Sequence, residues 1–258
     1  MKIAIIGYGK MGVMVEQLAR AGGHTVAAVI DPLVHDTPSG VPAFKTIAEA
    51  DFASVDAAIE FTQPTTAIEN IFALAKRKIP SVIGTTGWHN RMGEVKQVVE
   101  AAGSSLLWAS NFSIGVNLFY RIAWYAAELV NKFPEYDVGG FEAHHNKKLD
   151  SPSGTAKVLA EGVLSRIDRK NKIVWDTINR KSEPNELHFP SLRMGSVPGT
   201  HSLFFDSSAD TIELTHTARS REAFAGGAVR AAEWLTEQER QGVFSIDDML
   251  KDIWKELV

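Results

Sequence analysis

Short apolar runs alternate with amphipathic segments through the first half of the chain. Five runs are typical of strands: KIAIIG, HTVAAVID, DAAIEFT, IPSVIGTTG and SSLLWASNF. After the first run, apolar residues recur at helical spacing from Met11 to Leu18, and TTAIENIFALAKRK forms a second candidate helix. The alternation predicts βαβ units, in which a mainly parallel sheet carries helices on both faces.

The pattern changes after about Ser113. Residues 118–132 predict a helix, YDVGGFEAHH predicts a strand, and another helix is expected from about Pro152. Three β-rich pieces then follow: NKIVWD, LHFPSLRMGSVPGTHSLFFD and DTIELTHTA. Their spacing favours an α+β region with more antiparallel pairing, before REAFAGGAVRAAEWLTEQ returns the chain to helix. The segments SLFF and TIELTH fit either core strands or a sheet shared between subunits.

The composition narrows the function classes. A length of 258 residues favours one large domain or two modest ones, and 45% hydrophobic residues is typical of a globular protein with a buried core. A net charge of −4 provides no global basic surface, so we expect neither nucleic acid nor a membrane as a partner. The chain has no cysteine, which excludes disulfides, thiolate zinc sites and a cysteine nucleophile and suits the reducing cytoplasm.

No targeting segment or membrane span is expected from the sequence. Gly7, Gly9 and Lys10 interrupt the apolar start of the chain, which leaves it too short for a signal peptide. The longest uncharged run, residues 103–120, has the length of a membrane span, but its Ser and Asn residues argue against burial in lipid. We expect this run to form a buried strand, a loop and the start of a helix.

The segment GYGKMG places Gly7, Gly9 and Gly12 in GxGxxG spacing where the first strand meets the first helix. The first glycine permits a tight turn, the second lets the backbone approach a pyrophosphate, and the third allows close helix–strand packing. The helix N-terminus offers N–H groups and a positive dipole end to phosphates. Asp31 ends the second strand about 20 residues later, where an acid binds the adenosine ribose. Together these features predict a dinucleotide site.

The residues leave the choice between NADH and NADPH open. The Asp31 carboxylate repels a 2′-phosphate and favours NADH, whereas Lys10 in the glycine loop offsets that charge. Two later loops, GTTG (84–87) and ASNFS (109–113), each follow a strand. Because ligands lie beyond the carboxyl ends of the strands in doubly wound sheets, both loops fit the same pocket. Taken alone, each loop is more typical of an ordinary strand-to-helix turn.

The segment SPSGTAK predicts the start of a helix whose apolar stripe begins at Ala156. Proline suits the first turn of a helix and serine suits its cap, so the helix is expected to begin near Pro152 and Ser153. The backbone N–H groups of Ser153, Gly154 and Thr155 are therefore expected to be uncommitted. Such a helix start is an anion site by geometry.

Two histidines and two lysines lie just upstream, in EAHHNKKLD. His144 and His145 should point to opposite faces of a strand unless the strand has ended there. Lys148 supplies a fixed positive charge, and a histidine can donate a proton near neutral pH. This combination fits a pocket for a carboxylate-bearing substrate with a proton donor beside it. Two alternatives are a solvated charged loop and a metal site of His144, His145 and Asp150, which the neighbouring lysines oppose.

The stretch EAHHNKKLDSPSGTA resembles the His-His-x-x-Lys-x-Asp-x-Pro-Ser-Gly-Thr-Ala signature of the 4-hydroxy-tetrahydrodipicolinate (dihydrodipicolinate) reductases of the diaminopimelate route to lysine. The resemblance extends to GYGKMG, EFTQP, GTTGW, NFSIGVN, RMGSVPGTH and FAGGAVRAAEWL. It implies a Rossmann domain, residues 1–113 and 223–258. It also implies an α+β mixed-sheet domain, residues 114–222, that binds substrate and forms a homotetramer. The implied activity is NADH- or NADPH-dependent reduction of the substrate to tetrahydrodipicolinate.

The resemblance also implies roles for single residues. His144 is implied as the proton donor, and Lys148 as the residue that holds a small cyclic dicarboxylate substrate and supports catalysis. Other substrate contacts are implied at His145, Ser153, Gly154 and Thr155. The cofactor is implied at Gly7, Tyr8, Gly9, Lys10, Met11, Gly12, Asp31, Gly84, Thr85, Thr86, Ala109, Ser110, Asn111 and Phe112. No metal site is expected.

The chain departs from the family pattern at three places. Ser151 stands where alanine is usual, Glu60 stands where aspartate is common, and the glycine loop is shorter than the Gly-x-x-Gly-x-x-Gly form. One rival function is a different Rossmann oxidoreductase, such as an amino acid or sugar dehydrogenase, although the sequence has no Glu-Lys-Pro motif of the sugar type. The other rival is a non-catalytic nucleotide sensor, which would not need His144, Lys148 and the Ser-Gly-Thr turn together.

Overall fold

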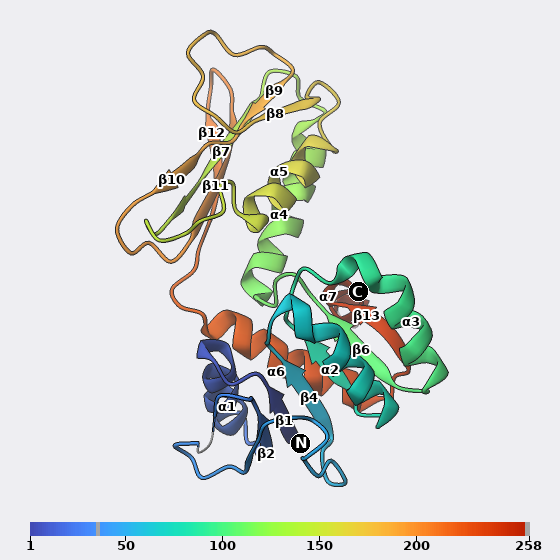
Figure 1. Cartoon of the computed structure of the whole chain (residues 1–258). Coiled ribbons are helices and arrows are strands. Elements are labelled where there is room, and N and C mark those ends of the chain that lie inside the picture. The colour runs from blue at the N-terminus through green and yellow to red at the C-terminus, as the bar shows by residue number, and fades with distance from the viewer. Residues whose placement is uncertain (35–36, 256–258) are drawn as a thin grey trace. The chain divides into compact units, whose positions relative to one another are not determined.

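A computed structural model describes residues 1–34 and 37–255. The chain divides into two compact units, each with its own sheet. Unit 1 comprises Met1–Ser113 and Arg221–Val258, so the C-terminal segment returns to the N-terminal unit. Unit 2 comprises Ile114–Ser220. The colour gradient of Figure 1 shows this return, because the red-brown helix α6 lies among the blue elements of unit 1.

The sheet of unit 1 has seven strands in the order β13-β6-β5-β4-β1-β2-β3. All of its strand pairs are parallel. The strands are β1 (Lys2–Ile6), β2 (Thr25–Ile30), β3 (Ala43–Phe44), β4 (Ala57–Glu60), β5 (Ser81–Ile83), β6 (Ser105–Trp108) and β13 (Gly242–Ser245). The strand order reverses at β1, which pairs with β2 on one side and β4 on the other. Ligands of doubly wound sheets bind at such a switch point, beyond the carboxyl ends of the strands.

Helices cover both faces of this sheet (Figure 1). They are α1 (Lys10–Ala21), α2 (Pro64–Lys76), α3 (Met92–Ala101), α6 (Glu222–Glu237) and α7 (Ile246–Lys255). Helices α1 and α6 pack together, and α2 packs with α3. Successive strand residues point to opposite faces, so Ala4 and Ile6 share one apolar cluster with Leu74 of α2. Burial on both faces explains why the strands of this unit are continuously apolar.

Unit 2 is built on a mixed sheet in the order β12-β11-β7-β9-β8, with β10 also paired to β7. Its strands are β7 (Asp137–His144), β8 (Lys172–Val174), β9 (Glu186–His188), β10 (Ser191–Arg193), β11 (Thr200–Asp206) and β12 (Thr211–Thr217). Its helices are α4 (Ile114–Val130) and α5 (Gly154–Leu164). Phe119 of α4, Leu159 of α5 and Phe205 of β11 belong to one buried cluster, so both helices share the core of this sheet.

The predicted fold class is confirmed, and the differences are local. Helix α4 begins at Ile114, four residues earlier than predicted, and α3, β3 and β13 were not predicted. Helix α5 begins at Gly154 with Ser153 as its N-cap, so Pro152 precedes the cap and does not enter the first turn. The uncharged run at 103–120 forms the expected strand, loop and helix start. Among the described residues, no helix is both long and apolar enough to span a membrane.

Candidate functional site

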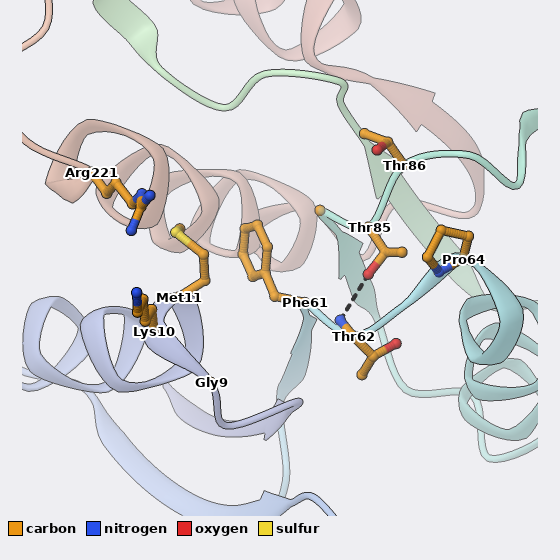
Figure 2. A pocket seen from close by; sticks show the side chains of 10 residues that line it. Gly9, Lys10, Met11, Phe61, Thr62, Pro64, Thr85, Thr86 and Arg221 are labelled. Carbon is orange, nitrogen blue, oxygen red and sulfur yellow. Dashed lines mark hydrogen bonds between the residues drawn. The ribbon is translucent and has the colours of Figure 1, made fainter. Parts of the chain in front are cut away.

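A cavity of about 530 Å³ lies at the carboxyl ends of β1, β4 and β5 in unit 1 (Figure 2). Residues from the three strand-end loops and from the start of α6 line it: Gly9, Lys10, Met11, Phe61, Thr62, Pro64, Gly84, Thr85, Thr86 and Arg221. The backbone N–H of Thr62 donates to the Thr85 hydroxyl at 2.8 Å, which fixes two of these loops to each other. The glycine loop and the GTTG loop, far apart in sequence, therefore share one cavity.

A second cavity of about 290 Å³ brings in the loop that follows β6. Its lining includes the predicted residues Ala109, Ser110, Asn111 and Phe112. It shares Met11, Phe61, Gly84 and Arg221 with the first cavity. The three loops proposed from sequence for one dinucleotide therefore border adjoining spaces.

The glycine loop has the geometry that a pyrophosphate requires. Gly7 has φ +90°, and a Cβ on it would lie 2.2 Å from the carbonyl oxygen of Phe61. A Cβ on Gly12 would lie 2.1 Å from the carbonyl oxygen of Gly7, so this position allows the close helix–strand contact. Gly9, in contrast, has nothing within 4 Å of that position and lines the cavity. No side chain of the described residues caps α1, so its first N–H groups can meet an anion.

Asp31 has a structural role that the sequence did not reveal. Its Oδ2 accepts the Tyr8 N–H at 2.8 Å, and its Oδ1 accepts the Leu33 N–H at 2.9 Å. The carboxylate thus ties the glycine loop to the segment after β2. The Tyr8 hydroxyl is turned away to donate to Glu16, and burial, followed by the nearby Glu16 carboxylate, raises the pKa of Tyr8 to about 12. Gly7, Tyr8, Gly12 and Asp31 shape the loop but do not line either cavity.

In unit 2, strand register gathers polar side chains on one face of the sheet. Glu142 and His144 are two residues apart in β7 and so point to the same face. In β10, Ser191 lies beside Glu142 and Arg193 lies beside His144. In β11, His201 is the direct cross-strand partner of Glu142. Alternating positions on three neighbouring strands therefore place a cluster of polar side chains next to the apolar core of this unit.

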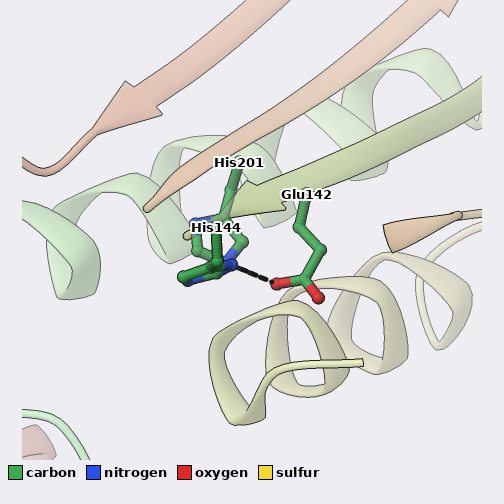
Figure 3. Close-up of side chains that lie close together, drawn as sticks. All are labelled: Glu142, His144 and His201. Carbon is green, nitrogen blue, oxygen red and sulfur yellow. Dashed lines mark ion pairs between the residues drawn. The ribbon is translucent and has the colours of Figure 1, made fainter. Parts of the chain in front are cut away.

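Glu142 contacts both histidines of this group, and Figure 3 shows its ion pair with His144. Its Oε2 lies 2.9 Å from His144 Nδ1 and 3.6 Å from His201 Nε2. Its Oε1 lies 2.9 Å from Arg193 Nη2. The His201 Nε2 also lies 3.2 Å from the hydroxyl of Ser153, the cap of α5. The cluster thus joins three strands to the start of a helix.

The environment separates the protonation states of these groups. Burial raises the pKa of Glu142, but hydrogen bonds from His144, His201, Ser153 and Ser191 outweigh it and hold that pKa far below the usual range. Burial lowers the pKa of His201. Near neutral pH, Glu142 is therefore a carboxylate and His201 a neutral imidazole.

The loop between β7 and α5 holds the remaining predicted residues. Strand β7 ends at His144, so His145 already belongs to this loop. Lys148 Nζ lies 2.8 Å from Asp150 Oδ1. Gly154 is exposed, and a Cβ there would have nothing within 4 Å.

One prediction about this helix start is wrong. The Ser153 N–H is not uncommitted, because it donates to Glu142 Oε1 at 3.0 Å. The Ser153 hydroxyl accepts the Ala156 N–H at 3.1 Å as the helix cap. An anion at α5 would therefore meet the backbone beginning at Gly154, whereas Ser153 anchors the helix to the sheet.

Ligand atoms of Glu142, His144 and His201 lie within 4.8 Å of one another, a spacing that a metal ion could bridge. This set differs from the His144, His145 and Asp150 set weighed from sequence. The Arg193 guanidinium already pairs with the same carboxylate, and a cation there would be repelled. The ion pairs with the two histidines and Arg193 and the hydrogen bonds to Oε1 account for the cluster, and we assign no metal to it.

Sequence reasoning missed residues in both units. In unit 1 these are Phe61, Thr62, Pro64, Arg221 and Phe224. In unit 2 they are Glu142, Ser191, Arg193 and His201. The segments EFTQP, RMGSVPGTH and EAHH contain several of them, so the signal was present but assigned no role. The position of Arg221 just before the FAGG helix carries no comparable signal.

Comparison with known proteins gives a consistent result for both units. The family model for "Dihydrodipicolinate reductase, N-terminus" matches residues 1–112, and that for "Dihydrodipicolinate reductase, C-terminus" matches residues 115–250. A 4-hydroxy-tetrahydrodipicolinate reductase of Christiangramia forsetii is 36% identical over 255 residues, covering 99% of this chain and 100% of the relative. One from Archaeoglobus fulgidus is 36% identical over 266 residues, covering 97% and 100%.

Solved structures show the same fold. A dipicolinate-bound dihydrodipicolinate reductase from Paenisporosarcina sp. TG-14 superposes with a TM-score of 0.76 at 21% identity, covering 95% of this chain and 97% of that one. An engineered D-amino acid dehydrogenase bound to NADP+ superposes with a TM-score of 0.55 at 17% identity, covering 95% and 93%. At these identities the likeness concerns the fold alone.

Proposed function

The chain belongs to the 4-hydroxy-tetrahydrodipicolinate reductase family, and we propose that it works with NADH or NADPH and uses His144 as its proton donor. It is an oxidoreductase of the diaminopimelate route to lysine. Membership along nearly the full length of both units favours this reaction over the rival dehydrogenase and sensor functions. The observation that carries the proposed residue roles is the ion pair between His144 and Glu142, in a cluster next to the start of α5.

The reaction sets what the residues must supply. Loss of water from 4-hydroxy-tetrahydrodipicolinate leaves a conjugated cyclic imine, and its reduction to tetrahydrodipicolinate takes up one hydride and one proton. A reduced nicotinamide supplies the hydride when it is bound. We assign the proton to His144, which lies at the end of β7 and is held by a carboxylate on one ring nitrogen. Such general acid catalysis contributes roughly 10²–10⁴-fold to a rate.

The cavities of unit 1 support the proposed cofactor site. The uncapped start of α1 and the side chain-free Gly9 suit a pyrophosphate. Lys10 and Arg221 add two positive charges to the same cavity wall. These positive charges favour any phosphate, including the 2′-phosphate that distinguishes NADPH from NADH, whereas the Asp31 carboxylate opposes that group. Because the two effects oppose each other, we propose that both NADH and NADPH are accepted.

The loop before α5 supports the proposed substrate site. Lys148 supplies a point charge, and its partner Asp150 is mostly exposed and can be exchanged for a substrate carboxylate. The first turn of α5 adds the positive end of a helix dipole beside the exposed backbone of Gly154. We propose that these groups, with Thr155 and His145, hold the carboxylates of a small cyclic dicarboxylate.

We also propose that the enzyme is a cytoplasmic homotetramer. Leu203 and Phe205 of β11 belong to the core with α4 and α5, so Phe204 between them points to the other face of the sheet. There its ring stacks on that of Phe141, with ring centroids 6.1 Å apart. An aromatic pair on this face suits contact with another subunit. Light scattering should give about four times the chain mass of 28.2 kDa, and a monomer would contradict this proposal.

Two substitutions test the proposed catalytic roles. His144→Gln removes the proton donor and should lower kcat about 10²- to 10⁴-fold with little change in the KM of the substrate. Lys148→Ala removes a charge from the carboxylate site and should lower kcat/KM about 10²-fold. Lys147→Ala, at the exposed neighbouring lysine, is the matched control and should retain activity. Turnover close to that of the unmodified enzyme in both His144→Gln and Lys148→Ala would refute these roles.

A further inference from the structure

Glu142 is a fully buried carboxylate to which neither the sequence pattern nor the family resemblance gives a role. Isolating a carboxylate from water is costly unless charged or hydrogen-bonding partners compensate it. Here Oε1 accepts three hydrogen bonds, from the Ser153 N–H (3.0 Å), the Ser191 hydroxyl (2.7 Å) and the Arg193 guanidinium (2.9 Å). These contacts anchor one oxygen to a helix start and a neighbouring strand.

The other oxygen faces two imidazoles. Oε2 lies 2.9 Å from His144 Nδ1 and 3.6 Å from His201 Nε2. His201 is neutral near neutral pH, because burial lowers its pKa, and its Nε2 also contacts the Ser153 hydroxyl. The shorter contact of Oε2 is the one with His144 Nδ1, which lies at ion-pair distance.

The opposite nitrogen of His144 borders a position without a side chain. A Cβ on Gly199 would lie 3.0 Å from His144 Nε2. Gly199 has φ +150°, a conformation that favours glycine. Because Nδ1 is in ion-pair contact with Glu142, Nε2 is the nitrogen left to reach a reacting atom.

We propose that Glu142 is a positioning residue for proton donation: Oε2 fixes the ring of His144 and stabilises its protonated form, so that Nε2–H faces the side-chain-free position of Gly199. This inference rests on the proposed role of His144. The same carboxylate, through Oε1, holds the start of α5 beside that ring. One buried group thereby sets the distance between the proton donor and the helix start proposed for the substrate carboxylates.

Other charges near His144 come from the neighbouring elements. Arg193 lies beside it on β10, His201 on β11, and Lys148 and Asp150 belong to the loop before α5. Arg193 is paired with Glu142, the carboxylate that also contacts His144, and Lys148 is paired with Asp150. Removing the charge of Glu142 therefore leaves Arg193 unbalanced next to the imidazole, which disfavours the imidazolium further.

The test is the pH profile of kcat for Glu142→Gln. The amide can keep its oxygen at the Oε1 position, and so the bonds from Ser153, Ser191 and Arg193, while the charge facing His144 is lost. Because the protonated donor is then less stable, the alkaline limb of kcat should move to lower pH by about 1 to 2 pH units. At a pH above the alkaline limbs of both enzymes, the kcat of Glu142→Gln should be about 10- to 100-fold lower than that of the unmodified enzyme.

A double-mutant comparison separates positioning from a structural role. In a His144→Gln background, Glu142→Gln should lower kcat by less than about 3-fold, because its partner is already gone. Glu186→Gln is the matched control: Glu186 is a buried carboxylate of β9 that pairs with Lys172 and Arg180, and its loss should leave the pH profile unchanged. Should Glu142→Gln not fold, Glu142→Asp, with its shorter reach toward His144, should shift the limb in the same direction by less.

The outcomes distinguish this inference from the proposed function. An unshifted alkaline limb in Glu142→Gln, or full additivity with His144→Gln, would overturn the positioning role while leaving His144 as donor. If His144→Gln itself turned over normally, the proposed donor would fail, and the positioning role of Glu142 would fail with it.

Discussion

At the scale of single residues, two buried glutamates have opposite surroundings. Glu142 is held as a carboxylate by its hydrogen-bond partners, which lower its pKa against the effect of burial. Glu60, at the end of β4, is equally buried, but burial outweighs its hydrogen bonds from Thr62, Thr85 and Asn70 and raises its pKa. Thr62 and Thr85 line the larger cavity of unit 1. The raised pKa favours the uncharged form of Glu60, and an uncharged Glu60 places less negative charge next to the proposed phosphate site.

Glu60→Gln should change stability in a pH-dependent way. A carboxyl with a raised pKa binds more protons in the folded than in the unfolded chain, so its contribution to stability falls as pH rises from its ordinary pKa of 4.5 to its folded pKa. The uncharged Gln avoids this loss. The free energy of unfolding of Glu60→Gln, relative to that of the unmodified protein, should therefore increase between pH 4.5 and 7.5 in urea titrations. A difference that is constant with pH would contradict the raised pKa.

The sequence singled out His144 but not its partners, and the reason is physical. The motif EAHHNKKLD lists neighbours along the chain, whereas His201 and Arg193 reach the site through strand pairing about 50 residues away. Glu142 is part of this motif, but a polar residue in a polar stretch gives no sign that its side chain is buried. The same holds for the Ser153 N–H, whose acceptor is Glu142.

At the scale of elements, the turn from β1 into α1 is a case in which the sequence motif predicted the local structure. The three glycines of GYGKMG differ in their surroundings as the motif predicts: Gly7 and Gly12 lie against backbone, and Gly9 lies against open space. Strand β1 was equally plain, because it is a short apolar run that ends in glycine. Helix α3 was harder, since it follows a 3-10 turn and has no side-chain cap among the described residues.

Two alanine substitutions in this turn should have separable effects. Gly12→Ala places a methyl group against the Gly7 carbonyl, so it should lower the free energy of unfolding by about 1 to 3 kcal/mol. Gly9→Ala places the methyl group at the edge of the cavity, so it should weaken cofactor binding with a smaller loss of stability. Urea unfolding and fluorescence titration with NADH and NADPH measure the two effects. If Gly9→Ala bound both cofactors with unchanged affinity, the cofactor site would not be the cavity that Gly9 lines.

At the scale of the whole molecule, the chain enters one unit, forms a second and returns to the first. Helix α6 packs on α1, and β13 adds to the sheet beside β6. The hydrophobic pattern predicted the late return to helix, but a four-residue edge strand such as β13 carries too few positions to show a period. The family resemblance, more than periodicity, connected the C-terminal helices to the first domain.

The central claim is that this chain reduces 4-hydroxy-tetrahydrodipicolinate with a nicotinamide cofactor. The direct measurement follows the loss of NADH or NADPH absorbance when the purified protein is mixed with freshly generated product of dihydrodipicolinate synthase. We predict oxidation that depends on both the protein and the substrate, with both cofactors active, and the ratio of the two rates gives the preference. No oxidation of either cofactor by folded protein would contradict the account.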